Sequence, residues 1–513
     1  MARPGFVLEV DDRTPPLVVP DGVGFRLERF PLDTRVIYPA ESLPAVPDVS
    51  EAINAALDAP LDSPPLTDRL RPGMKLTIAF DDISTPVPKM HKPDIRGRII
   101  EAVLRRAAAI GVDDVSLIAA RGLNRRMTEP ELQHVLGERV FRSFFGDGRL
   151  TSHDAEDPDQ LTTVGSTEAG EVTVNATAAE ADLLVFVHLA DSSGNGVRAV
   201  SAGLGSTATI GRLAAHPEHG ARPSAVEEID AQVAAACPIF QIEAVLDNSA
   251  FSPPLEFLGK REWEWNLKDQ AAWLAVHRGL AVASGKARRR ILGAAQAGYA
   301  PLQVVAGAPD AVSRSSVAKV SAQRLVEVNG QADVAVIGVP QATRYSVNSI
   351  TNPVLAAWSA LGATFNAHRG RPVVRAGGAL IVYHPMPVDF SPLHHPSYVD
   401  FFAEVLPATT DPVQIQEKFE TKFATDSWYT HLYRASHAFH GVHPFHLWYE
   451  MAAAREHCGD IIWVGAHRAT VDRLGFRAAS TLADALEIVS SSVGRSPSIS
   501  YLHNSVQLVA DVR

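Results

Sequence analysis

From Lys75 onward, the sequence alternates short apolar runs with longer segments of helical periodicity. An apolar run at 75–80 precedes a helical pattern at 94–110, and a second run at 115–120 precedes another helical pattern at 129–136. Parallel strands need long crossover connections, so this order predicts an α/β fold with largely parallel sheets and crossover helices. The alternation continues with strands expected at 182–188, 302–306, 334–339, 373–383 and 461–464, and with helices expected at 315–328, 354–361 and 482–490.

The chain is long enough for more than one hydrophobic core. Its 513 residues predict two or three domains. Trp263, Trp265 and Trp273 lead into a helical region at 269–297, after which a second series of strands and helices begins. We therefore expect one domain at 1–268 and a C-terminal α/β domain at 269–513.

Composition excludes several classes of partner. The net charge of -11 disfavours nucleic acid and anionic membranes, which both select basic surfaces. Two cysteines, Cys237 and Cys458, cannot form a disulfide framework, which fits a reducing compartment. We find no signal peptide at the start and no apolar run of membrane length, so a cytoplasmic location is expected.

Four polar residues follow the first apolar strand directly. Asp81, Asp82, Ser84 and Thr85 stand in FDDISTP, where the strand should end. Open α/β sheets bind their ligands at the carboxyl ends of their strands, so these side chains predict a binding crevice. The alternative is structural, with Asp82 or Ser84 capping the helix that begins near Pro93.

A basic loop follows the second strand. Arg121, Asn124, Arg125 and Arg126 precede Thr128 and Glu131, which together form a capping-box pattern. Guanidinium groups bind carboxylates and phosphates through paired hydrogen bonds, so the loop favours an anionic ligand at the same sheet edge. Ion pairing with nearby carboxylates is the alternative.

Histidines and glycines form two further groups. His437, His440, His443 and His446 lie close together, but no HExxH or CxxC pattern accompanies them, and we expect no metal site there. A segment at 190–205 is rich in glycine, which lets a backbone approach a ligand closely. The segment 338–353 follows a strand and carries Arg344, Tyr345 and Asn348, again at a sheet edge.

Several of these motifs resemble one family in order and spacing. FDDISTPVP, GLNRRMTEPEL and HDAEDPDQLTTVGSTEAGEVTVN are similar to segments of the nickel-dependent lactate racemase family, and IGVPQATRYSVNSITNP, FNAHRGRPVV and FHGVHPFHLWYE resemble a branch of it. The resemblance implies two mixed α/β domains with an interdomain cleft. It also implies a nickel-pincer nucleotide that accepts the Cα hydrogen of a 2-hydroxy acid as hydride, while one histidine on each face handles the hydroxyl proton.

The resemblance assigns catalytic positions unevenly. Asp82 stands at the position of the carboxylate that orients the first histidine, but Asn124 stands where that histidine belongs, and an amide is no general base. His188 matches the second catalytic histidine. Because one base is missing, the resemblance implies a substrate larger than lactate and a base other than Asn124.

The cofactor positions are also altered. Arg198 replaces the lysine that tethers the cofactor, so the nucleotide is expected to be held without a covalent bond. His216 is the expected nickel ligand, with His219 as the fallback. The remaining cofactor-binding residues are expected to be Ser84, Gly194, Gly196 and Trp448, and the substrate-binding residues Thr85, Arg125, Arg126, Tyr345 and Asn348.

Three functions remain open from the sequence. The first is racemisation or epimerisation of a larger hydroxy acid with the pincer nucleotide. The second is a one-sided oxidoreduction or elimination, with His188 as acid and base. The third is a cofactor-free relative that binds a small anion or a partner protein. A small-molecule substrate is the expected partner, and a homo-oligomer is allowed.

Overall fold

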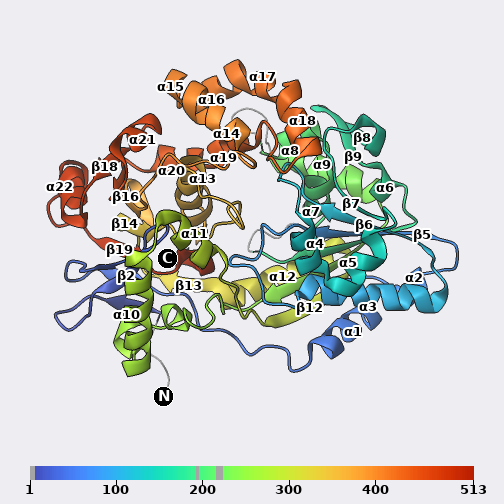
Figure 1. The fold of residues 1–513 in the computed structure, drawn as a ribbon, viewed down its shortest axis with the longest axis horizontal. Coiled ribbons are helices and arrows are strands. Elements are labelled where there is room, and N and C mark those ends of the chain that lie inside the picture. The colour runs from blue at the N-terminus through green and yellow to red at the C-terminus, as the bar shows by residue number, and fades with distance from the viewer. Residues whose placement is uncertain (1–5, 192–195, 215–222) are drawn as a thin grey trace.

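The protein is described by a computed structural model that covers residues 6–191, 196–214 and 223–513. Two large sheets, one in each half of the molecule, organise these residues (Figure 1). Each sheet is parallel except for one edge strand. The predicted α/β class with two mixed, largely parallel domains is confirmed.

The first sheet has six strands, and its central strands are those predicted from the start of the alternation. Their carboxyl ends lie side by side: Asp81, at the end of β5, pairs with Ala120, at the end of β6. The strand order is β12(Pro301–Gly307), β11(Ile239–Leu246), β10(Leu183–Leu189), β5(Lys75–Asp81), β6(Asp114–Ala120) and β7(Leu150–Ser152), with β12 antiparallel to β11.

Helices cover both faces of this sheet because its strands are apolar on both sides. Leu76, Ile78 and Phe80 of β5 pack under one layer of helices, whereas Ala79 packs under the other. The first layer contains α1(Val49–Asp58), α2(Leu66–Arg69), α3(Ile95–Ile110), α4(Glu129–Leu136) and α5(Glu138–Phe145). The second contains α7(Arg198–Leu204) and α9(Pro223–Ala236), with α6(Ala176–Ala179), α8(Thr207–Ala214) and the hairpin β8(Leu161–Thr167)–β9(Gly170–Asn175) beside it.

The second sheet has seven strands and lies in the other half. Alternate residues of β14 again face two cores, with Val334 and Val336 on one side and Ala335 and Ile337 on the other. The order is β1(Val7–Glu9), β4(Arg35–Ile37), β19(Ile499–Leu502), β14(Ala332–Gly338), β16(Val374–Tyr383), β17(Asp460–Val464) and β18(Arg477–Ala479). The helix α22(Leu482–Val493) packs on the first side, and α13(Pro353–Trp358) and α19(His443–Glu450) pack on the second.

The two sheets do not divide the chain at a single point. The N-terminal strands β1 and β4 belong to the seven-stranded sheet, and β12 belongs to the six-stranded sheet although it lies beyond residue 268. Figure 1 shows the blue N-terminal strands beside the red C-terminal elements. The division at residue 268 therefore stays a prediction about domains, and the sheets themselves interleave in sequence.

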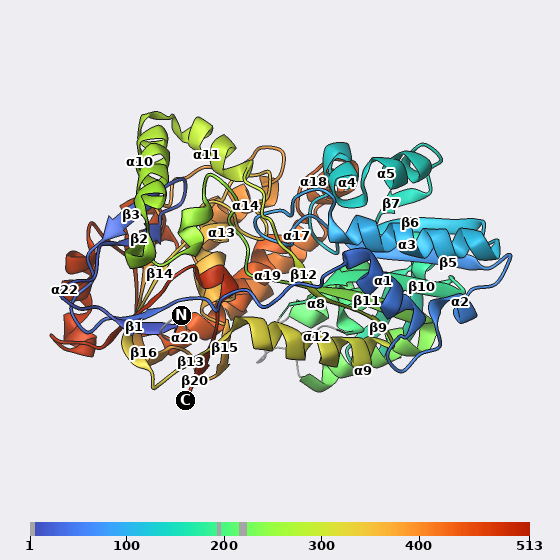
Figure 2. The same cartoon turned by 90° about the horizontal axis from the view of Figure 1, so that it is seen from below.

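Helices near the C-terminus bridge the two halves. In Figures 1 and 2, α18(Ser427–Ala435) lies against the half that holds the six-stranded sheet. The hydroxyl of Tyr433, on α18, donates to the carbonyl oxygen of Gly122 at 2.6 Å. The other helices of this C-terminal region are α14(Pro396–Asp400), α15(Leu406–Ala408), α16(Pro412–Ile415), α17(Thr421–Ala424), α20(Ala452–His457) and α21(Arg468–Arg473).

Several element boundaries differ from the predicted ones. The helical region at 269–297 is two helices, α10(Leu267–Val282) and α11(Gly285–Gly293), because Ser284 caps a new helix. The helix expected at 315–328 is α12(Pro309–Arg324) followed by the strand β13(Leu325–Val328), which pairs with β20(Val509–Val512) and, through it, β15(His368–Gly370). The helix α13 continues into a π-helical turn, η4(Ser359–Thr364). Strands β2(Leu17–Pro20) and β3(Phe25–Glu28) form a separate hairpin.

None of the helices within the described ranges is both long and apolar enough to cross a membrane.

Candidate active site

A cleft of about 700 Å³ lies between the two halves. One wall is formed by the carboxyl ends of β5, β6 and β10, and the other by the loop after β14, the turn η4, helix α19 and residues 505–509. This placement agrees with the rule that open parallel sheets bind ligands beyond the carboxyl ends of their strands. The predicted interdomain cleft is thus present in the structure.

An acid–base pair stands at the floor of this cleft. Asp81, the last residue of β5, accepts a hydrogen bond from Nδ1 of His188 on β10, at 2.8 Å. Its second oxygen accepts from the backbone N–H of Leu189, also at 2.8 Å. Nε2 of His188 is buried and has no hydrogen-bond partner among the described residues. The imidazole is therefore fixed at one nitrogen and unengaged at the other.

Electrostatics make this histidine unusually basic. Burial alone would lower the pKa of His188, but the attraction of Asp81 outweighs it and raises that pKa to about 9. Glu243, opposite His188 on β11, and Asp191 act in the same direction. Burial likewise opposes ionisation of Asp81, yet His188 and the Leu189 amide hold the pKa of Asp81 below its usual range. At neutral pH the pair is an imidazolium and a carboxylate.

The second carboxylate of the strand tip points to a different partner. Asp82 accepts from the amide nitrogen of Asn124 at 2.9 Å, and Oδ1 of Asn124 accepts from Nε2 of His443 at 3.0 Å. The other ring nitrogen of His443 is hydrogen-bonded to the hydroxyl of Tyr398 at 2.5 Å. Burial lowers the pKa of His443 well below its ordinary value, so His443 is neutral. This chain of contacts joins the two halves and fixes the side-chain amide of Asn124. One N–H of that amide makes none of these hydrogen bonds.

Buried contacts shape the two loops that carry these residues. Arg96 pairs with Asp94 at 2.7 Å and also donates to the carbonyl oxygens of Asp81 and Asp82. Asp94 is the N-cap of α3, so neither Asp82 nor Ser84 caps this helix. In the second loop Gly122 has φ +51°, and a Cβ there would lie 2.4 Å from the carbonyl oxygen of Ala202. Only glycine permits this close approach.

Two charged side chains face the cleft from the C-terminal half. Arg344 and Glu450 both line it and are exposed to its interior. Arg344 forms no hydrogen bond or ion pair within the part of the chain that is described. Its guanidinium group lies 5.9 Å from the centre of the Tyr345 ring. Glu450 accepts from Nε1 of Trp358 at 2.6 Å, and desolvation by the surrounding walls raises its pKa. The cleft thus offers one cation without a partner and one weakly acidic carboxyl group.

Half of the predicted site residues meet in this cleft. All three predicted catalytic residues line it, and so do members of the other predicted groups: Asp82, Asn124, His188, Ser84, Thr85, Arg198 and Tyr345. Arg198 also forms an ion pair with Asp230 at 3.3 Å. Their roles stay predictions, but the structure places them around one cavity.

Three of the predicted substrate-binding side chains lie elsewhere. Arg125 is buried in an ion pair with Glu131 at 2.6 Å, and Asn348 donates to the same carboxylate at 2.7 Å. Burial disfavours the Glu131 anion, but these contacts lower its pKa to about 2. For Arg125 the structure therefore shows an ion pair with a nearby carboxylate, which was the alternative to binding an anionic ligand. Arg126 lies in a separate hollow.

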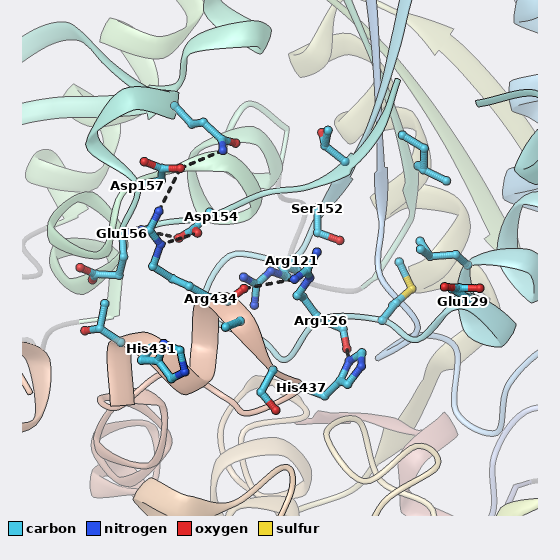
Figure 3. Close-up of a pocket in the computed structure, with 18 of the residues that line it drawn as sticks. Arg121, Arg126, Glu129, Ser152, Asp154, Glu156, Asp157, His431, Arg434 and His437 are labelled. Carbon is cyan, nitrogen blue, oxygen red and sulfur yellow. Dashed lines mark hydrogen bonds and ion pairs between the residues drawn. The ribbon is translucent and has the colours of Figure 1, made fainter. Parts of the chain in front are cut away.

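Figure 3 shows this second hollow, of about 1250 Å³, on the other side of the basic loop. Oppositely charged side chains pair within this hollow: Arg434 forms ion pairs with Asp154 at 2.9 Å and with Asp157 at 3.0 Å. Arg126 donates to the carbonyl oxygen of Arg434, and His437 is hydrogen-bonded to the carbonyl oxygen of Arg126 (Figure 3). These contacts join the two halves, and we assign the hollow a structural role.

Other predicted cofactor positions lie outside the cleft. Trp448 is fully buried, donates to the carbonyl oxygen of Thr410 at 3.0 Å, and does not line the cleft. Gly196 is nearest to Asp310 and Ser313 of α12. Gly194 and both nickel-ligand candidates, His216 and His219, lie outside the described residues.

Sequence reasoning assigned no catalytic or binding role to four residues of the cleft wall: Asp81, Arg344, His443 and Glu450. Three of them stand in motifs that it singled out, namely the strand tip, the segment 338–353 and the histidine group. The sequence motifs therefore marked the neighbourhood of these three residues. They could not give the contacts of each residue, because its partners are distant in sequence. Glu450 is the last residue of FHGVHPFHLWYE, a segment that carries part of the resemblance but gave this residue no role.

The described residues offer no complete metal site. They contain no group of three or more His, Cys, Asp or Glu side chains arranged to hold a metal ion. They offer no lysine at the tether position either, since Arg198 stands there. The cleft does offer room, the Arg198 guanidinium and an imidazole nitrogen without a partner. These features fit a nucleotide held without a covalent bond.

The fold and the cleft define a class: a two-sheet α/β protein with a buried histidine–aspartate pair in the cleft between its halves. Residues 24–220 match the lactate racemase N-terminal domain family. The whole fold is similar to that of the lactate racemase apoprotein from Thermoanaerobacterium thermosaccharolyticum, with a TM-score of 0.64 at 16% identity, covering 96% of this chain and 99% of that one. Residues 24–220 thus form a lactate racemase N-terminal domain, and the chain as a whole shares the fold of the lactate racemase apoprotein.

A second solved structure, a protein from Thermotoga maritima, is less similar. It gives a TM-score of 0.49 at 13% identity and covers 91% of this chain and 97% of that one. A search of curated proteins gave no match.

Proposed function

We propose that this protein is a racemase or epimerase of a 2-hydroxy acid larger than lactate. The observation that carries the proposal is the His188–Asp81 pair, with Nε2 of His188 unengaged at the floor of an interdomain cleft. The family supports an isomerase. The departures at Asn124 and Arg198 argue against lactate itself as the substrate.

His188 is the proposed acid and base for the substrate hydroxyl. With Nδ1 bound to Asp81, only Nε2 can exchange a proton with a ligand in the cleft. Because the imidazolium predominates at neutral pH, the minor neutral form of His188 accepts the hydroxyl proton as the alcohol is oxidised, and the imidazolium returns it when the carbonyl is reduced. Asp81 holds the ring orientation and stabilises the imidazolium. A pKa of about 9 keeps the proton on His188 once it has been taken up.

Arg344 is the proposed clamp for the substrate carboxylate. A guanidinium group that lines a cleft without an ion-pair partner is suited to bind a carboxylate through two parallel hydrogen bonds. Asn124 contributes differently. Its amide is fixed by Asp82 and His443, so its remaining N–H can donate to a substrate oxygen but cannot remove a proton.

Inversion requires a second proton-handling group, because the carbonyl is reduced from its other face and its oxygen then takes up a proton, which the same group removes in the reverse direction. We propose Glu450 for this role. It lines the cleft, opens to its interior, and has a raised pKa, which makes it a stronger base than an ordinary carboxylate. The neutral His443 is held at both ring nitrogens and acts by positioning Asn124.

The family's nickel-pincer nucleotide supplies, when bound, an acceptor for the hydrogen on Cα. The side chains that would hold it are Arg198, for phosphate, and Ser84 beside the strand tip. Arg198 cannot replace the lysine as a tether, so the proposed binding is non-covalent. The chain's own residues bind the acid, orient its hydroxyl and move the hydroxyl proton.

One observation favours a second candidate function. The proton-handling groups on the two sides of the cleft differ, because Asn124 stands where the family pattern has a histidine. If Glu450 does not act as a base, the chemistry is one-sided, and the protein oxidises or dehydrates a hydroxy acid with His188 alone.

Chiral analysis tests the proposal. The protein, co-produced with the enzymes that make the nickel-pincer nucleotide, is incubated with single enantiomers from a panel of 2-hydroxy acids. We expect interconversion of at least one larger acid and its complete loss in His188→Gln. Formation of a keto acid or an alkene without inversion supports the one-sided function. No turnover in the loaded protein contradicts both.

A further inference from the structure

An apolar cavity of about 700 Å³ adjoins the cleft. It lies between the helix pair α10–α11, the segment 250–255 and the β2–β3 hairpin. In Figures 1 and 2, α10 stands beside this hairpin, and the rings of Phe25 and Trp273 meet edge to face at 6.4 Å. The helix pair thus forms one wall of this cavity.

The lining of this cavity is unlike the rest of the chain. Asp, Glu, Lys and Arg make up 20% of the sequence, yet the described residues that line the cavity include none of them. Ile291 and Val506 are 55% and 50% exposed, although both belong to this lining. Apolar side chains that remain accessible inside a hollow mark a site for an apolar ligand.

The cavity and the cleft share part of their lining. Both are bounded by the same stretch, Ser505 to Gln507, and by the same turn after β14, at Gly338 and Pro340. The side chain of Gln507 is buried at this boundary, and its amide nitrogen makes no hydrogen bond in the described structure. A ligand that crosses this shared boundary would have its polar end in the cleft and its apolar end in the cavity.

We propose that this cavity binds the apolar substituent of the substrate, so that the substrate class is 2-hydroxy acids with a long alkyl or aryl side chain. The inference rests on the proposed function, because the cleft with Arg344 and His188 receives the hydroxy-acid end. It explains how the protein selects acids larger than lactate. The selecting contacts are Phe251, Leu280 and Ile291 rather than any residue of the acid–base pair.

Equilibrium binding tests the inference without requiring turnover. Isothermal titration calorimetry of the full chain would use an unbranched series of 2-hydroxy acids, from lactate to 2-hydroxyoctanoate and 2-hydroxydecanoate. Burial of each methylene group should tighten binding roughly fourfold. An affinity that does not change with chain length would overturn the inference.

A matched pair of variants locates the binding. Ile291→Asp places a charge in the cavity at an exposed position of α11, so the fold should tolerate it. Val282→Asp is the control, because Val282 is 89% exposed at the end of α10 and does not line the cavity. We expect Ile291→Asp to abolish the gain with chain length and Val282→Asp to preserve it. Equal behaviour of the two variants would overturn the inference.

Two further results separate this inference from the proposed function. If binding tightens with chain length but the protein turns over no hydroxy acid, the cavity's role in binding is supported and the proposed isomerase function is contradicted. If turnover is independent of chain length, the proposed isomerase function is supported and the cavity's role in substrate binding is contradicted. A 1-alkanol that binds as tightly as the hydroxy acid of equal length overturns the inference, because the cavity would then act without the cleft.

Discussion

At the scale of single residues, the two adjacent carboxylates of the strand tip have separate partners. Asp81 contacts His188, whereas Asp82 contacts Asn124. The sequence predicted that both stand at a binding edge, but it assigned the orienting role by resemblance to Asp82 alone. Which carboxylate meets His188 depends on the pairing of β5 with β10, and local sequence does not determine that pairing.

The Asp81–His188 contact predicts a specific pH response. In Asp81→Asn the largest attraction that raises the pKa of His188 is lost, so burial should bring that pKa down from about 9. In the wild type this pKa is raised, so the pair stabilises the fold fully below pH 6.5, and the stabilisation is lost as pH rises through about 9. Titration of the His188 ring by NMR measures the shift directly. An unchanged pKa in the variant would show that Asp81 is not its cause.

The Arg344 clamp predicts an effect on substrate binding. Arg344→Gln removes a charge-assisted contact with the carboxylate, which should weaken binding about ten- to a hundredfold. Arg126→Gln is the matched control, since Arg126 lies in the hollow of Figure 3 and does not line the cleft. KM for the best hydroxy acid, or its Kd by calorimetry, provides the measurement. A loss seen only with Arg126→Gln would instead restore the sequence-based assignment of Arg126.

At the scale of elements, the loops of the site depend on close backbone contacts. Strand and helix positions followed from apolar periodicity, and α4 spans the predicted 129–136. Other boundaries could not be predicted because their causes are tertiary. Val326 and Val328 form a strand only because β20 lies beside them, although the local pattern continues a helix.

The loop after β6 offers a direct test of such a contact. Gly122→Ala and Gly73→Ala both place alanine at positive φ, but nothing lies within 4 Å of a Cβ at Gly73. Alanine in the left-handed region costs roughly 1 kcal/mol, so Gly73→Ala should lower the free energy of unfolding by about that amount. Gly122→Ala must also displace Ala202, and we expect at least twice that loss, about 2 kcal/mol or more.

Denaturant unfolding measures this difference, and the affinity for a hydroxy acid measures its effect on Asn124. We expect Gly122→Ala to weaken binding and Gly73→Ala to leave it unchanged. Equal losses of stability in the two variants would mean that the Ala202 contact has no energetic importance.

At the scale of the whole molecule, the site exists only because two halves meet. The predicted fold class and cleft are confirmed, and the three predicted catalytic residues line one cavity. The contacts of His443 with Asn124 and of Tyr433 with Gly122 span more than 300 positions of sequence. No local pattern encodes such pairs, which is why Arg344 and Glu450, on the opposite wall, were not assigned from sequence. The same distance explains why the β1 and β4 strands were not predicted to join the C-terminal sheet.

The central claim is that His188 handles only the hydroxyl proton while the hydrogen on Cα moves without exchange. The most direct measurement follows one enantiomer of a hydroxy acid deuterated at Cα, in ordinary water, with the cofactor-loaded protein. We predict that both enantiomers accumulate with deuterium retained, and that His188→Gln forms neither product. Inversion accompanied by loss of deuterium to water would contradict the account, because the Cα hydrogen would then leave as a proton.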